Sequence, residues 1–256
     1  MFSWLSSLLA QWKISLISLT ALALTIPLLP YLSTHPLSQS FAPNVANVST
    51  VPNTSRNWSG YTATGGSFTS VIGSWIVPQV AGNGHAAADA TWVGIGGVQS
   101  RDLIQSGTLD LISSSGHETH SAFVEMLPNL AQQIPVTISS GDSITVSVTE
   151  KSTNRWQISF TDTTNGQTYT TTALYPSSLS SAEWIVEAPS NGRRILPLAN
   201  FGTIDFSGAS TIENGSQVTI AQSNAQSIIM VNSRGQTIAI PSSLGSDGAS
   251  FSISYV

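Results

Sequence analysis

The chain has 256 residues, only 8% of them charged, and a formal net charge of −5. A nucleic-acid partner requires clustered Lys and Arg facing the phosphates. Here the two lysines, Lys13 and Lys151, lie far apart, and Arg193 with Arg194 is the sole basic pair. We therefore expect no nucleic-acid partner. The absence of cysteine excludes disulfides, zinc–thiolate sites and a thiol nucleophile.

Carboxylates are scarce as well, with 13 Asp and Glu in the whole chain. Acid unfolding arises mostly because native carboxylates lose a stabilising charged state as the pH falls. With few such groups, and with Ser, Thr, Gly and Asn supplying the polar surface, the composition indicates a protein suited to acid solution.

The N-terminal part has the pattern of a targeting segment. Lys13 precedes the apolar run Ile14–Leu32, which is interrupted late by Pro27 and Pro30. We expect residues 1–37 to be a signal peptide that is cleaved, because proline weakens a spanning helix, and the protein to be secreted. The alternative is a membrane anchor on the outer cell face, because the run is near the ~20 residues that span a bilayer. Residues 38–56, rich in Ser, Pro, Asn and Thr, are expected to be a linker or short propeptide.

The remaining residues, 57–256, are expected to form one all-β domain. The stretch Ser143–Glu150 alternates polar and apolar side chains, which is typical of a strand with one buried face. Similar runs occur at 68–77, 91–95, 119–126, 156–161, 168–173, 182–187, 228–231, 237–240 and 251–255. Turn pairs such as Asn83-Gly84 and Asn214-Gly215 separate them. Many short strands with frequent turns favour an antiparallel β-sandwich or barrel.

Several catalytic motifs are missing from the sequence. It has no Gly-x-Ser-x-Gly elbow, no Asp-Thr-Gly or Asp-Ser-Gly, and no phosphate-binding glycine loop. The segment His117-Glu118-Thr119-His120 resembles a metal motif, but two histidines three apart on a strand point to opposite faces. A catalytic zinc would also need a third ligand nearby. We expect a polar turn leading into a strand, and no metal or organic cofactor.

Carboxylates carry most of the remaining catalytic potential. A strand would put Glu183 and Glu187 on one face, roughly 13 Å apart, which is too far for them to share a proton. Glu125 is expected to point away from the apolar face of its own strand, together with Phe123. Composition alone does not single out Gln105, which lies in the segment Leu-Ile-Gln-Ser-Gly.

The order of several segments together carries more information than any one of them. The segments are Asn57-Trp-Ser-Gly60, Gly73-Ser-Trp-Ile-Val-Pro78, Thr91-Trp-Val-Gly-Ile95, Leu103-Ile-Gln-Ser-Gly107, Phe123-Val-Glu-Met-Leu-Pro128, Ser140-Gly-Asp-Ser143, Ala182-Glu-Trp-Ile-Val-Glu187 and Leu196-Pro-Leu-Ala-Asn-Phe201. This ordered set resembles the glutamic peptidases, the eqolisin family. The resemblance covers most of residues 57–256 and is firmest up to Ala209.

The resemblance implies a fold, a catalytic pair and a reaction. The fold would be a sandwich of two curved antiparallel sheets with a concave substrate groove. Gln105 and Glu187 would be the catalytic pair, and Trp92 and Glu125 would line or support the groove. Ionised Glu187 would take a proton from water and return it to the leaving amine, while Gln105 would hold the water and stabilise the oxyanion. Substrates would be proteins or peptides, cut by a monomer in acid solution.

The sequence departs from the fungal members of that family at some positions. Those members carry an aspartate where Gly96 stands, an aromatic residue where Leu127 stands, and disulfides. We therefore carry over no subsite preference, and the chain resembles a cysteine-free, prokaryotic-like branch.

Two alternative functions remain compatible with the sequence. One is a secreted or anchored β-sandwich that binds carbohydrate or protein through exposed Trp and Tyr, since the chain has seven Trp. The other is a glycoside hydrolase that uses two carboxylates, for instance Glu125 and Glu187. Gln105 discriminates between them and the peptidase, because a glycosidase should tolerate its loss better than the loss of Glu125.

Overall fold

The structure is a computed structural model that describes residues 53–191 and 194–256. The targeting segment and most of the linker expected over residues 1–56 lie outside the described residues. The described part contains 16 β-strands and no helix, in agreement with the all-β prediction. Within these ranges, no helix is long and apolar enough to cross a membrane.

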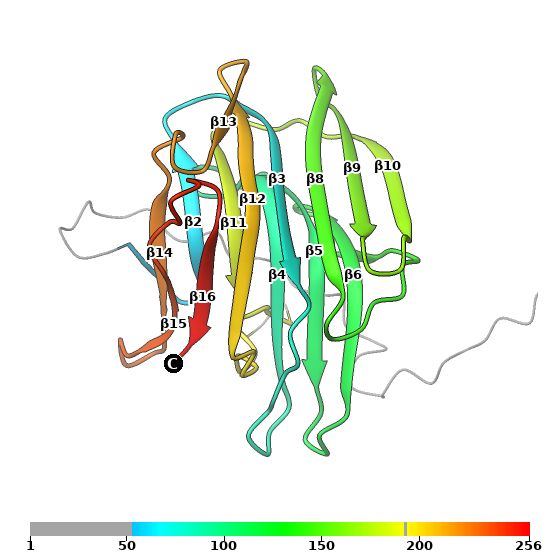
Figure 1. The fold of residues 1–256 in the computed structure, drawn as a ribbon, viewed down its shortest axis with the longest axis vertical. Helices are drawn as coiled ribbons and strands as arrows, with labels where there is room; N and C mark the ends of the chain where they lie inside the picture. Colours follow the sequence, from blue (N-terminus) through cyan, green and yellow to red (C-terminus); the bar gives the residue numbers. More distant parts are fainter. Residues whose placement is uncertain (1–52, 192–193) are drawn as a thin grey trace, which may run out of the picture. The chain divides into compact units, whose positions relative to one another are not determined.

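The strands are short to medium in length and follow one another with few long loops. They are β1 (Thr54–Ser55), β2 (Trp58–Thr64), β3 (Phe68–Ile76), β4 (Ala87–Gly96), β5 (Leu103–Ile112), β6 (Glu118–Met126), β7 (Gln132–Gln133), β8 (Ser143–Ser152), β9 (Arg155–Asp162), β10 (Thr168–Leu174), β11 (Ser181–Glu187), β12 (Thr203–Glu213), β13 (Ser216–Thr219), β14 (Gln226–Val231), β15 (Thr237–Pro241) and β16 (Phe251–Tyr255) (Figure 1).

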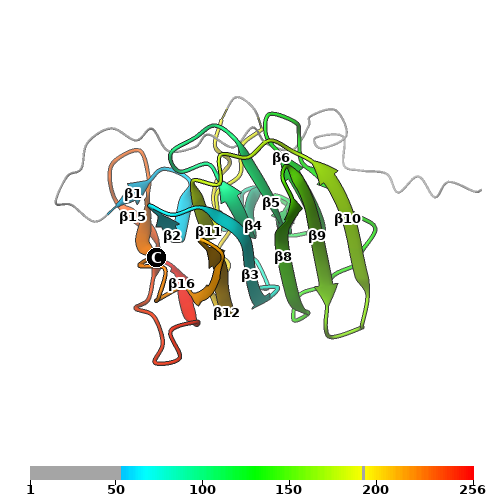
Figure 2. The ribbon, with the colours of Figure 1, turned by 90° about the horizontal axis from the view of Figure 1, so that it is seen from above.

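These strands form one continuous sheet that folds over into two layers. The hydrogen-bonded order is β10-β9-β8-β3-β12-β16-β15-β14-β2-β11-β4-β5-β6-β7. Strands β3, β8, β9 and β10 lie in one layer, and β4, β5 and β6 lie behind them in the other (Figure 2). The pairing is antiparallel except between β1 and β14, which run parallel. The predicted antiparallel sandwich is confirmed.

The core lies between the two layers because the alternating strands turn their apolar faces inward. On β8 and β9 the buried positions alternate strictly, as the sequence pattern predicts. Trp75 and Phe206 pack together in this core, with ring centroids 5.6 Å apart. Strands β4 and β5, in contrast, are buried on both faces. A second apolar cluster therefore covers the face of β4 and β5 that points away from the core.

The predicted strands are present, but the sequence patterns predict neither the short strands β1, β7 and β13 nor the longer strands β2, β5 and β12. Strand β5 is buried on both sides, so its sequence lacks alternation. Strand β2 is likewise buried on both faces, at every position except Thr64. In β12 a register shift between Ser207 and Ser210 breaks the pattern. Each of these longer strands thus lacks the period of two on which the prediction depends.

The described fold begins upstream of the predicted domain start at Asn57. Strand β1 pairs with β14, and the carbonyl of Asn53 accepts a hydrogen bond from the N–H of Ile229. The buried Ser55 hydroxyl accepts hydrogen bonds from the N–H groups of Asn57 and Trp58. Residues assigned to the linker therefore contribute to the folded domain.

Candidate active site

Four neighbouring strands bring four of the predicted side chains to one face of the sheet. Strands β11, β4, β5 and β6 lie side by side, and they carry Glu187, Trp92, Gln105 and Glu125 respectively. This face is the one turned away from the core, where Ile185 on β11 belongs to the second apolar cluster. Because side chains alternate along a strand, Glu187 lies on the same face as Ile185.

Glu187 is buried and accepts a hydrogen bond at each carboxylate oxygen. The Asn57 amide donates from Nδ2 to Oε1 at 3.1 Å, and the Trp92 indole donates from Nε1 to Oε2 at 2.9 Å. Burial raises the pKa of Glu187 to about 7, although the two N–H donors act in the opposite direction by stabilising the ionised form. Its two donors make Glu187 the carboxyl of this face best suited to carry a negative charge.

The Trp92 side chain is fixed by its neighbours on both sides. The Trp58 ring meets it edge to face, with centroids 5.0 Å apart. Gly107 is the cross-strand partner of Trp92 on β5, and a Cβ atom at Gly107 would lie 2.6 Å from the Trp92 Cβ. A Cβ atom at Gly107 would also lie 2.0 Å from the Thr91 carbonyl oxygen, so the glycine that follows Gln105-Ser106 allows β4 and β5 to approach closely beside Trp92.

Gln105 and Glu125 lie directly opposite each other on β5 and β6. The Gln105 Nε2 atom lies 2.5 Å from Glu125 Oε2, and both residues are buried. Burial and the nearby Glu187 charge raise the pKa of Glu125 to about 8. Burial beside a second carboxyl thus favours the protonated form of Glu125.

Gln105, Glu125 and Glu187 together line one cavity. Its remaining walls are apolar or backbone and come from Ala90, Leu109, Phe123, Ala131 and Pro189. The structure thus joins the predicted pair and Glu125 in one small concave site, while Trp92 holds Glu187 from the side. Chemically, this arrangement offers a carboxylate base and an amide donor within one partly apolar pocket.

Tyr175 connects the strand ends next to Gln105 and Glu125. Its hydroxyl accepts a hydrogen bond from the Leu103 N–H and donates one to the Leu127 carbonyl, each at 2.8 Å. Leu103 lies two residues before Gln105, and Leu127 lies two residues after Glu125. The bridge fixes the spacing of the two strands where the site is built.

Glu183 is separate from the cavity. Its side chain is fully buried, and neither carboxylate oxygen has a hydrogen-bond partner in the described structure. Burial raises the pKa of Glu183 well above its ordinary value, so the group is neutral in acid. Of the two glutamates on β11, only Glu187 reaches Gln105's pocket.

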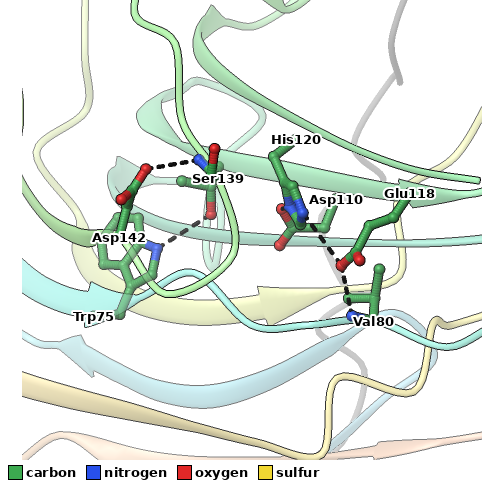
Figure 3. A network of polar contacts seen from close by, with 8 residues as sticks. Trp75, Val80, Asp110, Glu118, His120, Ser139 and Asp142 are labelled. Carbon is green, nitrogen blue, oxygen red and sulfur yellow. Dashed lines mark hydrogen bonds and ion pairs between the residues drawn. The ribbon is translucent and has the colours of Figure 1, made fainter.

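The histidine segment forms a polar network at another part of β5 and β6 (Figure 3). His120 lies 2.6 Å from Asp110 and 3.2 Å from Glu118, and Glu118 also accepts the Val80 N–H at 2.7 Å. Burial favours neutral His120, but the hydrogen bond and charge of Asp110 outweigh it and raise the pKa of His120. His117 precedes β6 in an exposed turn, as predicted. Within residues 53–191 and 194–256, no group of three or more such side chains is arranged to hold a metal.

Asp89 faces Asp110 across β4 and β5 behind this network. Both carboxyls are fully buried. Burial and the charge of Asp110 raise the pKa of Asp89 well above its ordinary value. Two neighbouring carboxyls that are both shielded from water cannot both ionise without a large cost in free energy. The pair is therefore a structural feature that depends on at least one proton.

Two residues of the site were not identified from the sequence. Asn57 belongs to the first matching segment, but its amide also fits a glycosylation signal, Asn57-Trp-Ser. In the structure that amide is buried and donates to Glu187. Tyr175 follows β10 in a stretch with no motif, so only its tertiary contacts identify it.

The fold has two antiparallel layers, and a glutamine and a glutamate are buried together in one site. Together with the similarity to known proteins, these features define a peptide hydrolase of the glutamic type. The sequence matches the Peptidase A4 family over residues 56–255, and the chain belongs to this family. It is 29% identical over 188 residues to Aspergillopepsin-2 of Aspergillus niger, covering 64% of this chain and 67% of that protein. It is 30% identical over 188 residues to Scytalidopepsin B of Scytalidium lignicola, covering 69% and 71% respectively.

Solved structures agree with this assignment. The chain is similar to scytalido-glutamic peptidase bound to a peptide-based transition-state analogue, with a TM-score of 0.67, 28% identity, and coverage of 78% of this chain and 98% of that one. It is also similar to SCP-B, a member of the eqolisin family in complex with the tripeptide Ala-Ile-His, with a TM-score of 0.64, 27% identity, and coverage of 78% and 98%. The predicted family and fold are confirmed, and the chain is an enzyme.

Proposed function

We propose that this chain is a secreted endopeptidase that cuts proteins in weakly acidic solution with Gln105 and Glu187. The observation that carries the proposal is that both side chains line one cavity while Glu187 accepts two N–H donors. Similar proteins were solved with a peptide-based analogue and with a tripeptide. These complexes support a peptide or protein substrate here.

The proposed reaction is hydrolysis of an amide by water. Ionised Glu187 removes a proton from a water molecule, and the resulting hydroxide attacks the peptide carbonyl carbon. The Gln105 amide donates a hydrogen bond to the oxygen on which negative charge develops. The tetrahedral intermediate then collapses, the C–N bond breaks, and protonated Glu187 returns its proton to the leaving nitrogen. No group other than these two and water is needed to balance the step.

Glu187 is the better base of the two carboxyls in the cavity. The Glu187 oxygens accept hydrogen bonds from the side chains of Asn57 and Trp92, whereas Glu125 has the Gln105 amide, the Ala131 N–H and an apolar wall around it. The pKa values of about 7 and about 8 have the same order. When the environments of two carboxyls separate their pKa values, the lower one serves as the base.

The working pH follows from two opposing effects. Glu187 must be ionised, so its raised pKa moves the expected range from acid towards weakly acidic and neutral solution. Neutral Asp89 and Glu183 are buried in the fold, and their raised pKa values favour the folded state in acid. We therefore propose activity mainly in weakly acidic solution.

Secretion and a monomeric state complete the proposal. Secretion is supported by the apolar run of residues 14–32 behind Lys13. A monomer is supported by the surface of the described part, where the exposed large apolar side chains come from separate elements. These side chains are Ile76, Leu130, Leu174, Ile195, Ile240 and Val256.

The binding-module alternative loses its main feature. It depended on exposed Trp and Tyr, but all five tryptophans of the described residues are buried and none of the described tyrosines is exposed. The five tryptophans are Trp58, Trp75, Trp92, Trp156 and Trp184. The glycosidase alternative keeps its two carboxylates, Glu125 and Glu187, which share the cavity.

A digestion assay tests the proposal. Purified protein should release peptides from a denatured protein substrate in weakly acidic solution, and neither pepstatin nor a metal chelator should inhibit it. The Gln105→Ala variant should lose this activity and should also hydrolyse no glycoside. Glycoside hydrolysis that survives in Gln105→Ala but not in Glu125→Gln would instead establish the glycosidase.

A further inference from the structure

The contact between Gln105 and Glu125 leaves two polar atoms without partners. Nε2 of Gln105 lies 2.5 Å from Oε2 of Glu125, while the Oε1 atom of each residue is buried and has no hydrogen-bond partner in the described structure. The oxygen and nitrogen of a glutamine amide have nearly the same shape, so their hydrogen bonds decide the orientation. The amide could therefore be turned by 180° without moving any other atom.

The length of the contact favours the turned orientation. An N–H···O bond normally measures about 2.7–3.2 Å between heavy atoms, whereas an O–H···O bond measures about 2.5–3.0 Å. The 2.5 Å separation lies below the N–H···O range and at the short end of the O–H···O range, so it is compatible with a bond between two oxygens. Turning the amide brings its oxygen to Glu125 and puts the NH₂ group where the buried, unpaired oxygen stood, so that a hydrogen-bond donor is left free there.

The surroundings of Glu125 keep a proton available for such a bond. From β11 the Glu187 carboxyl faces it, and from the segment after β10 the Tyr175 phenol lies near it, so that both neighbouring titratable groups are acids. Only the Gln105 amide and the Ala131 N–H favour the charged form. No Lys, Arg or His forms an ion pair with Glu125 among the described residues. Burial with these neighbours raises the pKa of Glu125 to about 8.

We propose that Glu125 is a positioning residue whose neutral carboxyl donates its O–H to Gln105 Oε1 and thereby directs the Gln105 N–H groups into the cavity beside Glu187. The inference rests on the proposed function, since it assigns how Gln105 becomes a donor to the oxyanion. The proton stays on Glu125 throughout the reaction. When Glu125 ionises, its oxygens can only accept, so the amide turns, Nε2 is held by Glu125, and the amide oxygen faces the developing negative charge.

This arrangement makes the active form of the site singly ionised. Glu187 must have lost its proton and Glu125 must have kept its own. The acid limb of the pH–rate profile then reports Glu187, and the alkaline limb reports Glu125. Because the two carboxyls interact through one cavity, both limbs belong to the coupled pair.

Two substitutions at Glu125 separate hydrogen bonding from packing. In Glu125→Gln the new amide can donate an N–H to Gln105 Oε1 at every pH, whereas Glu125→Met fills a similar volume and donates nothing. With the full chain and a quenched-fluorescence peptide, kcat of Glu125→Met at about pH 6.5 should fall on the order of a hundredfold with KM little changed. For Glu125→Gln we expect kcat within about fivefold of the unaltered protein, and no alkaline limb near pH 8 while the protein stays folded.

A spectroscopic measurement tests the same step without activity. In the unaltered protein the side-chain ¹H–¹⁵N signals of Gln105, assigned by their loss in Gln105→Ala, should move as the pH rises through the alkaline limb. In Glu125→Gln they should stay in place. The matched control is Glu183→Gln, which removes another buried carboxyl with no contact to Gln105 and should leave both the limb and the signals unchanged.

Three results would overturn the proposal. They are an unchanged alkaline limb in Glu125→Gln, an unchanged kcat in Glu125→Met, or Gln105 signals that ignore pH in the unaltered protein. Failure of the proposed function looks different, because Gln105→Ala would then remain active whatever the Glu125 variants do.

Discussion

The indole N–H of Trp92 donates to Glu187 Oε2 at 2.9 Å, across the pair of strands β4 and β11. This bond holds the carboxylate towards the cavity and stabilises its ionised form. It acts against the burial that raises the pKa of Glu187. The bond therefore sets the pH at which the proposed base becomes available.

Replacing Trp92 by Phe should raise the pKa of Glu187 further, because the substitution removes a donor to the charged form. A hydrogen bond to a charged group contributes about 1.5–3 kcal/mol, which corresponds to roughly one to two pKa units. The acid limb of kcat/KM should move up by about that much, with a loss of roughly ten- to a hundredfold at pH values below it. Trp75→Phe is the control, since its indole donates to Thr108 instead. An acid limb that moves equally in both variants would contradict this role of Trp92.

The proposed catalytic pair predicts which substitutions abolish peptide hydrolysis and which do not. Gln105→Ala and Glu187→Gln should each reduce peptide hydrolysis by at least about a hundredfold while the protein stays folded. The double variant should be scarcely worse than either single one, because groups that act as a unit give non-additive losses. Glu183→Gln should keep substantial activity, since Glu183 does not line the cavity. Steady-state kinetics with circular dichroism as the folding check measures all four; activity lost in Glu183→Gln but kept in Glu187→Gln would reverse the assignment.

Stability should fall as the pH rises from acid to neutral. The pKa of Glu183 is raised above its ordinary value of 4.5, so folded Glu183 keeps a proton that the unfolded chain releases. Its contribution is fully present below about pH 4.5 and is lost as the pH rises towards the folded pKa, by up to about 1.4 kcal/mol per pH unit. Asp89 acts in the same direction. Urea unfolding at several pH values measures this loss.

Glu183→Gln isolates one of these contributions. The variant should lose less stability between about pH 5 and 7 than the unaltered protein does, because its amide does not ionise. Asp205→Asn, at an exposed position on β12, should leave the slope unchanged. Parallel curves for the unaltered protein and Glu183→Gln would show that Glu183 contributes nothing to the pH dependence.

Processing should leave β1 intact. The sequence predicts an active form that starts between about Ser38 and Asn57, and the structure narrows this range because the Asn53 carbonyl and the Ser55 hydroxyl are used in the fold. We expect the first residue of the secreted protein between Ser38 and Asn53. N-terminal sequencing of active protein from the medium checks this. Active protein that retains Met1 in a membrane fraction would favour the anchor instead.

The sequence by itself determined the fold class, the family and the main residues of the candidate site. The alternation of polar and apolar residues in segments such as Ser143–Glu150 predicts strands, because one face of such a strand is buried and the other faces solvent. An ordered set of short segments predicts Gln105 and Glu187, because the resemblance to the glutamic peptidases depends on the order of the segments and not on any one of them. Strand β5, which carries Gln105, was not predicted, because burial on both faces removes the alternating pattern.

The tertiary structure decided which side chains meet and in which charge state. Asn57 and Glu187 are 130 positions apart, and only strand pairing brings the amide to the carboxylate. The raised pKa values of Glu125 and Glu187 depend on burial beneath residues from other strands, which no local sequence encodes. Local patterns fix strands because they reflect neighbours along the chain, whereas desolvation and hydrogen bonding depend on neighbours in space.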